Sequence, residues 1–99
     1  MMDINTIYEG IKKSASSADP IGSTLKFDFG EDKIYIDGTN GENVVSLEDK
    51  DAACLITVSK EDFLKLTSGD LNPMMAVMTG KVKIKGDMGI AMKLQSLIG

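Results

Sequence analysis

Residues 80–99 read GKVKIKGDMGIAMKLQSLIG, and their pattern says more about the architecture than any other part of the chain. Val82 and Ile84 alternate with lysines, a period of two that predicts a β-strand with one buried face. A Gly-Asp pair ends this pattern, and Asp87 is a suitable N-cap for the apolar segment behind it. We therefore predict a strand that leads directly into a helix over residues 88–98.

The predicted C-terminal helix is apolar over an unusually wide arc. At ~100° per residue, its apolar side chains cover roughly 220° of the circumference, whereas a helix that rests on one sheet needs about 100°. Another element, a second chain or a bound apolar molecule has to cover the excess. Gln95 projects inside the arc, where an amide without a partner would cost about 1–3 kcal/mol. Its partner is either the backbone or water near the helix end, or the polar end of an apolar ligand.

Methionine is concentrated in the same region of the chain. This unbranched, flexible side chain fills irregular spaces, so a local excess suits a surface that adapts to different apolar guests. Plain filling of a core would use the same residues. Five of the seven methionines belong to this group: Met74, Met75, Met78, Met88 and Met92.

The remaining elements follow from the same periodicity and capping rules. The segment at 52–58 is apolar at both parities, which predicts a strand covered on both faces and placed centrally in the sheet. The last strand arrives after two helices, so it is a candidate for parallel pairing with an earlier strand. The order predicts an α+β fold with helices against a mixed, mostly antiparallel sheet. The predicted elements before the last strand are a helix at 4–15, strands at 25–29, 33–37, 44–47 and 52–58, and helices at 60–68 and 73–79.

Composition restricts the class of function. With 99 residues, 42% of them hydrophobic, the chain fits one domain over residues 1–99. All 11 basic residues are lysines, and the net charge of -4 makes nucleic acid an unfavourable partner. The absence of His and the single cysteine, Cys54, exclude Ser-His-Asp and Cys-His catalysis and a thiolate zinc site. We expect no cofactor and no metal.

Two features bear on where the protein acts. No apolar run approaches the ~20 residues of a membrane span, and we see no signal peptide, so we expect a cytoplasmic protein. Lys81, Lys83 and Lys85 would fit an anionic membrane surface, but a row of lysines also keeps the edge of a sheet from aggregating. We favour the second explanation for these lysines.

Three blocks occur together in order: DLNP at residues 70–73, GKVKIKG at 80–86 and MGIAMKLQ at 88–95. They follow ACLITV at 53–58, and residues 24–58 have the pattern of consecutive strands. On these blocks the chain resembles the sterol carrier protein type 2 domain over nearly its whole length.

The resemblance implies a five-stranded mixed sheet with helices on one side and an apolar tunnel between the two layers. It implies no catalysis, and a lipid ligand: a fatty acid, a fatty acyl-CoA, a phospholipid or a sterol. The last helix would line the tunnel, with the Gln95 amide near the polar end of the ligand, and the short helix at 73–79 would contribute wall. The ligand-binding residues that we expect on this basis are Ile34, Met75, Met78, Val82, Ile84, Met88, Ala91, Met92 and Gln95.

Two hypotheses of different class follow. The first is a non-catalytic, intracellular lipid-binding or lipid-transfer protein, with transient membrane contact and with the monomer as the favoured oligomeric state. The alternative is a protein interaction module that dimerises through its apolar C-terminal helix. In some members of the family a Trp stands near Ile34, a Phe stands near Val77 and Met78, and a Gln replaces Thr79, so we expect this tunnel to be roomier and less polar at one end.

Overall fold

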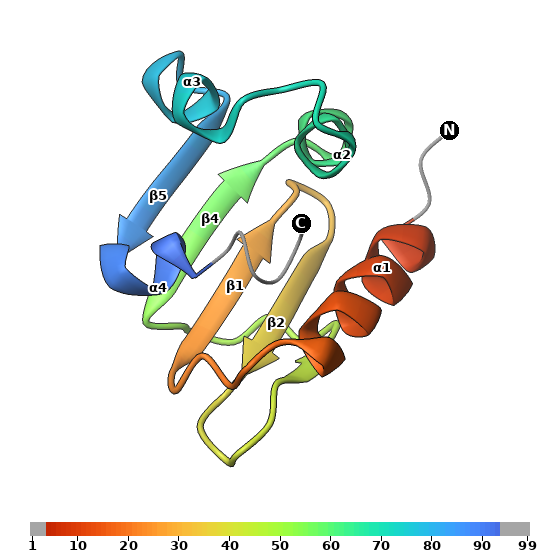
Figure 1. The fold of residues 1–99 in the computed structure, drawn as a ribbon, viewed down its shortest axis with the longest axis vertical. Helices are drawn as coiled ribbons and strands as arrows, with labels where there is room; N and C mark the ends of the chain where they lie inside the picture. The colour runs from red at the N-terminus through yellow and green to blue at the C-terminus, as the bar shows by residue number, and fades with distance from the viewer. Residues whose placement is uncertain (1–3, 94–99) are drawn as a thin grey trace.

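The computed structural model describes residues 4–93, which form a five-stranded sheet and four helices (Figure 1). The described residues thus have the α+β composition that the sequence predicts. In chain order the elements are α1 (Ile4–Ser17), β1 (Thr24–Asp28), β2 (Lys33–Asp37), β3 (Val44–Ser46), β4 (Cys54–Val58), α2 (Lys60–Ser68), α3 (Pro73–Met78), β5 (Val82–Gly86) and α4 (Met88–Met92).

The strands are ordered β3-β2-β1-β4-β5 in a mixed sheet. The parallel pair is β1 with β4, and β5 runs antiparallel to β4. The expectation that the last strand pairs parallel is therefore wrong. Both α2 and α3 lie beyond the end at which β4 leaves the sheet, so the chain re-enters from that end and runs back along β4 (Figure 1).

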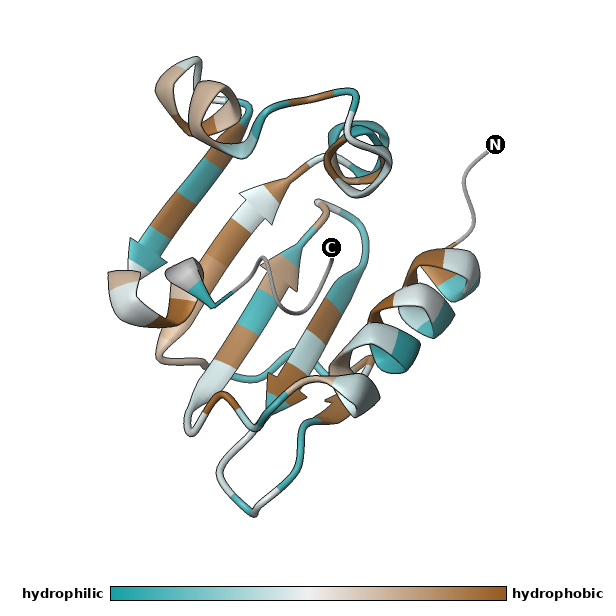
Figure 2. Ribbon diagram, in the orientation of Figure 1, coloured by the Kyte–Doolittle hydropathy of each residue, from teal (hydrophilic) through white to brown (hydrophobic). Residues whose placement is uncertain are grey.

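One face of the sheet is apolar from edge to edge. The register places Ile34, Phe27, Ile56 and Ile84 in one row across β2, β1, β4 and β5. The first three of these side chains are at most 1% exposed, and Ile84 is partly buried. Figure 2 shows the cause in the sequence, since hydrophobic and hydrophilic residues alternate along the strands. A second row, parallel to the first, consists of Val45, Ile36, Leu25 and Cys54.

The opposite face of the sheet is polar, and it corrects the prediction for residues 52–58. In β4, Leu55 is only partly buried and Thr57 is exposed, so the strand is not covered on both faces. The register places Leu55 between Lys26 on β1 and Lys85 on β5, where long lysine stems can lie over an apolar neighbour. The strand is interior, as expected, but β1 is the central one.

The helix ends form as local chemistry predicts. The Ser59 hydroxyl accepts a hydrogen bond from the Asp62 N–H at 3.0 Å, and Gly69 ends α2 with a φ of 84°. Asn72 caps α3 by accepting from the Met74 N–H at 2.9 Å, and Asp87 caps α4 in the same way. The continuation of α4 that the sequence predicts beyond residue 93 lies outside the described residues.

The helices pack mainly on the two outer sides of the apolar face (Figure 1). α1 lies against β3, where the Tyr8 hydroxyl donates to the Val45 carbonyl at 3.2 Å. α3 lies beside β5, and α4 contacts β4 and β5. Lys93, at the end of α4, donates to the Ile21 carbonyl at 3.0 Å and so ties α4 to the segment before β1. No helix in the described range is long and apolar enough to cross a membrane.

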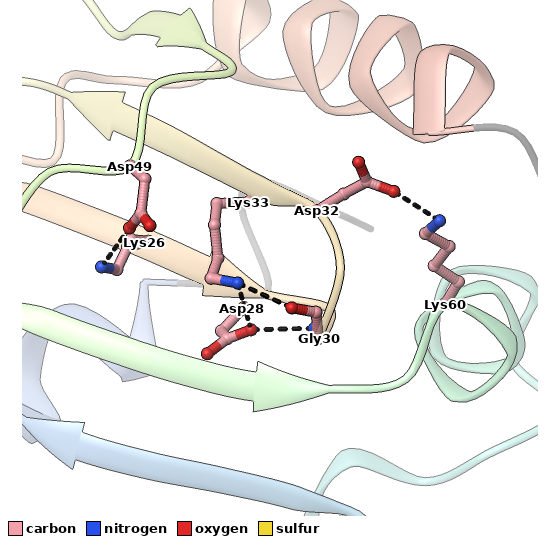
Figure 3. A network of polar contacts seen from close by, with 7 residues as sticks. All are labelled: Lys26, Asp28, Gly30, Asp32, Lys33, Asp49 and Lys60. Atoms are coloured by element: carbon pink, nitrogen blue, oxygen red, sulfur yellow. Dashed lines mark hydrogen bonds and ion pairs between the residues drawn. The ribbon is translucent and has the colours of Figure 1, made fainter.

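Ion pairs at the β1–β2 turn hold α2 in place (Figure 3). Asp28 accepts from the Gly30 N–H at 2.8 Å and pairs with Lys33, which closes the turn on itself. Asp32, in the same turn, pairs with Lys60 at the start of α2 at 2.6 Å. The turn is therefore linked to the start of α2.

Candidate functional site

The candidate site is the apolar layer between the sheet and the helices. Every buried side chain that the structure describes in this layer is apolar, and none is charged or polar. Such an interior has no buried hydrogen-bonding group that would select a polar guest. An aliphatic chain or ring system placed against these buried side chains would meet mainly carbon and sulfur atoms.

Three phenylalanines pack together at one end of this layer. The Phe63 ring, on α2, stands edge-on to both Phe27 and Phe29, with a centroid separation of 5.4 Å in each case. Edge-to-face pairs of this kind add about 0.5–1.5 kcal/mol each beyond the area that they bury. The cluster anchors α2 to β1.

A cavity of about 140 Å³ lies between α1 and α2. It adjoins the phenylalanine cluster, because Phe63 forms some of its wall. The space is partly open to the surface, and Thr6, Ser14 and Thr67 add hydroxyl groups to a mainly apolar wall. The cavity is smaller than the ~300–1,000 Å³ of typical ligand pockets. Its lining residues are Thr6, Ile7, Gly10, Ile11, Ser14, Phe63, Leu64 and Thr67.

The residues that the sequence predicts for ligand binding fall into three groups. Ile34, Val82 and Ala91 are buried at 0%, 4% and 8% exposure, and Ile84 is partly buried beside them on the apolar face. The methionines Met75, Met78 and Met88 are exposed at 53%, 78% and 55%, so in this structure they lie on the surface. The Met92 side chain and all of Gln95 lie outside what the structure describes.

The structure brings only some of these residues together. Val82 and Ile84 lie on β5, and Ala91 lies on α4, which packs against β4 and β5. Ile34 lies on β2, at the other end of the row that contains Ile84, with Phe27 and Ile56 between them. The predicted set therefore spans the width of the apolar face rather than one compact pocket.

Sequence reasoning did not find the cavity between α1 and α2. The periodicity of each helix marks Ile7, Ile11 and Phe63 as core residues. It contains no signal that these two helices meet, because they are far apart in the sequence. Gly10 is the one local hint. A glycine inside a helix lowers the stability of that helix, so its presence there often has a packing reason.

Cys54 is a buried titratable side chain of the apolar layer, and its thiol has low reactivity. The thiol is 0% exposed, and burial raises its pKa, with a smaller contribution from Asp87. A neutral thiol is a poor nucleophile and a poor metal ligand. Among residues 4–93, no group of three His, Cys, Asp or Glu side chains could hold a metal ion. The arrangement can shelter an apolar guest.

Known proteins agree with this geometry. Human sterol carrier protein 2 is 49% identical over 63 residues, which are 63% of this chain and 12% of that protein. The chain thus spans a small fraction of the length of the relatives that it matches. Sterol carrier protein 2 like 2 from Aedes aegypti has a similar fold, with a TM-score of 0.74 and 23% identity over 96% of this chain and 95% of that one.

A solution structure of the same Aedes aegypti protein in its palmitated form has a TM-score of 0.70 and 24% identity, over 98% of this chain and 95% of that chain. These two likenesses concern the fold. The family itself is shown by a model described as the SCP-2 sterol transfer family, which matches residues 4–99. The chain belongs to the SCP-2 sterol transfer family.

Proposed function

We propose that this chain is a cytoplasmic, non-catalytic lipid-binding protein. It carries a fatty acid, a fatty acyl-CoA, a phospholipid or a sterol in the apolar layer and exchanges the ligand during transient contact with membranes. The observation that carries the proposal is the wholly apolar character of the buried described residues, in a chain that belongs to a sterol transfer family. The palmitated relative favours a fatty acyl chain as the moiety that is buried.

The energetics suit reversible carriage. A ~16-carbon chain gains about 12 kcal/mol at ~0.8 kcal/mol per buried methylene, and association costs about 4–15 kcal/mol. At the low end of that cost, about 8 kcal/mol remains, which corresponds to a micromolar dissociation constant; a higher cost gives weaker binding. A carrier needs this range because it must release what it binds.

The layer has to open to take a whole chain, because the cavity of about 140 Å³ is below the usual size of a ligand pocket. Its walls belong to α1 and α2, which join the sheet through loops. An acyl chain that enters between them would separate these helices without breaking the hydrogen bonds between strands. We propose this opening as one route into the layer, with the space beneath α4 as the other.

We retain the residues that the resemblance implies as proposed ligand contacts. Met88, Met92 and Gln95 would close over the ligand from the C-terminal side, and the exposed Met75 and Met78 would turn inward when a ligand fills the layer. The flexible methionine side chain allows such a change without moving the backbone. The proposed contacts on the apolar face are Ile34, Val82, Ile84 and Ala91.

The proposed lack of catalysis rests on Cys54, whose burial raises its pKa and keeps the thiol protonated at neutral pH. A hydrolytic or transferase activity would need an ionised nucleophile or a base in contact with the ligand. No buried side chain within residues 4–93 is charged, so the described part of the layer supplies no such group. We therefore place the activity in binding alone.

Native mass spectrometry of the purified protein, followed by extraction into organic solvent, tests the proposal. We expect a copurified lipid, and binding of a fluorescent fatty acid that unlabelled palmitate displaces. Delipidated protein that binds no fatty acid, acyl-CoA, phospholipid or sterol at saturating concentration would exclude the function.

Two matched variants then locate the ligand. Gly10→Leu adds a side chain to the wall of the cavity between α1 and α2, where a Cβ meets no atom within 4 Å. Ala91→Leu adds a similar bulk beneath α4, where Ala91 is 8% exposed. Weaker binding by one variant alone, at unchanged folding, assigns the chain to that side of the layer.

The rival function, dimerisation through the C-terminal helix, makes a different prediction. In the described residues of that helix, Ile90 and Ala91 face the domain's own interior, at 4% and 8% exposure. Light scattering decides between the two: a dimer that takes up no lipid, and that Met88→Glu converts to a monomer, would replace the lipid-binding proposal.

A further inference from the structure

α3 exposes an apolar surface that the fold does not cover. Ala76 is fully buried and anchors the helix beside β5, while the larger side chains around it point outward. Met74 and Met78 are 75% and 78% exposed, so most of each side chain lies outside the packed interior. We call this set the α3 surface; it consists of Met74, Met75, Val77 and Met78, and each of these is at least 43% exposed.

Positive charge accompanies the α3 surface. Residues 73–86 contain three lysines and no acidic residue, in a chain whose net charge is -4. The rest of the protein is therefore more acidic than the total suggests. Lys81, Lys83 and Lys85 are all exposed, and no carboxylate within residues 4–93 forms an ion pair with any of them.

Lys81 lies beside α3, and Lys83 and Lys85 follow it along the adjoining edge strand, on the polar face of the sheet. β5 is an edge strand, and α3 packs directly beside it. Lys81 lies between the two elements, and its N–H donates to the Ala76 carbonyl at 2.9 Å, which fixes the lysine next to the helix. Apolar side chains that can enter a lipid interface are thus joined to cations that can meet lipid phosphates.

We propose that the α3 surface and the three lysines dock this protein on an anionic lipid bilayer. The proposal rests on the lipid-carrying function and specifies where the transient membrane contact occurs. The methionines enter the boundary between headgroups and acyl chains, and the lysines pair with phosphates. The acidic remainder of the chain is repelled by the same bilayer, so the charge asymmetry orients the protein with α3 towards the lipid.

A second copy of the chain fits this surface less well. A two-fold interface would set the same three lysines of one subunit near those of the other, and like charges in contact are unfavourable. Specific interfaces also bury about 800 Å² on each partner, and α3 has only six residues. A bilayer requires neither shape complementarity nor such an area.

Docking through α3 would bring the bilayer next to the proposed ligand contacts. Met75 and Met78 belong both to the α3 surface and to the tunnel wall that the resemblance implies. Their side chains, which are exposed in this structure, would enter lipid during docking and turn inward once a ligand fills the layer. Lipid transfer would then take place at the β5 side of the sheet.

Vesicle flotation tests the proposal with the intact chain. We expect the protein to float with vesicles that contain phosphatidylglycerol, to bind pure phosphatidylcholine vesicles much more weakly, and to be released by salt. The variant Lys81→Gln/Lys83→Gln/Lys85→Gln should bind about 100-fold more weakly at low salt, since each lysine near an anionic surface contributes about fivefold. Lys12→Gln/Lys13→Gln/Lys50→Gln removes the same charge from other parts of the chain. This control should bind the anionic vesicles far more tightly than the Lys81/Lys83/Lys85 variant.

A second pair of variants tests the apolar residues of the α3 surface. Met74→Gln/Val77→Thr alters two exposed residues outside the proposed ligand contacts and should weaken vesicle binding about tenfold. Val44→Gln/Leu47→Gln makes a comparable change at positions that are 50% and 49% exposed near β3, and it should bind as the unmodified protein does. Equal losses in the test and control variants, or no binding of the unmodified protein to anionic vesicles, would overturn the docking proposal.

Fatty-acid displacement without vesicles separates this proposal from the function on which it rests. Variants that bind the fluorescent fatty acid normally but no longer float support docking through α3. Protein that floats but binds no lipid in solution would retain the docking surface and remove the carrier function. A dimer that Met74→Gln/Val77→Thr dissociates, with no flotation, would assign the α3 surface to a second copy and overturn docking.

Discussion

Cys54 of β4 and Gly86 at the end of β5 are direct partners across an antiparallel pair of strands. Gly86 has a φ of 101°, a conformation that side chains of L-residues rarely adopt. A Cβ at this position would collide with the Ala53 carbonyl oxygen, which itself accepts a hydrogen bond from the Asp87 N–H at 2.9 Å. The chain therefore turns from β5 into α4 at a point where only glycine fits.

Gly86→Ala should consequently destabilise the protein by more than the usual cost of a positive φ. We expect a loss of at least ~2 kcal/mol in the free energy of unfolding, measured by urea denaturation. Gly69→Ala is the matched control, because Gly69 has a φ of 84° but open space around its Cβ position. It should lose only ~1 kcal/mol. Equal losses in the two variants would show that contact with Ala53 contributes nothing.

Asn43, in the loop between β2 and β3, joins three segments through one side chain. Its Oδ1 accepts from the Ile21 N–H at 3.0 Å, and its Nδ2 donates to the carbonyls of Ala15 and Asp19 at 3.2 and 3.0 Å. Ile21 is only 3% exposed, so water cannot easily replace the lost acceptor. Asn43→Ala should destabilise the protein by about 2 kcal/mol, because the Ile21 N–H and the Ala15 carbonyl lose a partner in a part-buried position.

Two further variants make this test specific. Asn43→Asp keeps the acceptor for Ile21 and loses the donors, so its stability should lie between those of the unmodified protein and Asn43→Ala. Asn40→Ala, at an exposed position of the same loop, should change the free energy of unfolding by less than ~0.5 kcal/mol. A loss at Asn43 no larger than that at Asn40 would contradict the proposed role.

Cys54 should react with a thiol reagent only when the protein opens. The side chain is 0% exposed and burial raises its pKa, so both access and thiolate formation are suppressed. Ellman's reagent should therefore modify the native protein far more slowly than the urea-unfolded protein. Asn40→Cys adds an exposed thiol to the same chain and should give one fast and one slow phase, whereas two fast phases would show that Cys54 is accessible.

The capping residues could be predicted because they act locally. Ser59, Asn72 and Asp87 each bond to an N–H two or three residues further on, so the sequence alone contains both partners. Strand pairing could not be read in the same way. Whether β5 runs parallel or antiparallel to β4 depends on where α2 and α3 lead the chain, and that is a property of the packed molecule.

The candidate site also contains some residues that local sequence signals predict and others whose role depends on the packed structure. Val82 and Ile84 alternate with lysines, and both face the apolar layer as that alternation predicts. The methionines were ambiguous from the start, since one flexible apolar side chain serves a core, a ligand wall or a docking surface. Met78, at 78% exposure, lies on the surface because the single buried position of α3 is taken by Ala76. Only the packed structure distinguishes these roles.

The dependence of stability on pH follows from carboxylates at the turns. The Gly30 N–H, with help from Lys33, lowers the pKa of Asp28, and hydrogen bonds from Thr39 lower the pKa of Asp37. The unfolded chain then binds more protons than the folded one below the ordinary Asp pKa of about 3.9. Stability should be fully present above this value and fall as the pH drops through the lower pKa values of the folded state.

Urea midpoints measured between pH 2 and pH 8 test this sign. They should stay nearly constant from about pH 5 upward, because the chain contains no His to titrate there, and decline below about pH 4. Asp28→Asn should be less stable than the unmodified protein at pH 7, and this difference should shrink as the pH approaches 2. The difference shrinks because protonation removes from the unmodified protein the charge that the variant already lacks. A difference that stays constant over the whole range would mean that the Asp28 charge does not stabilise the turn that positions α2.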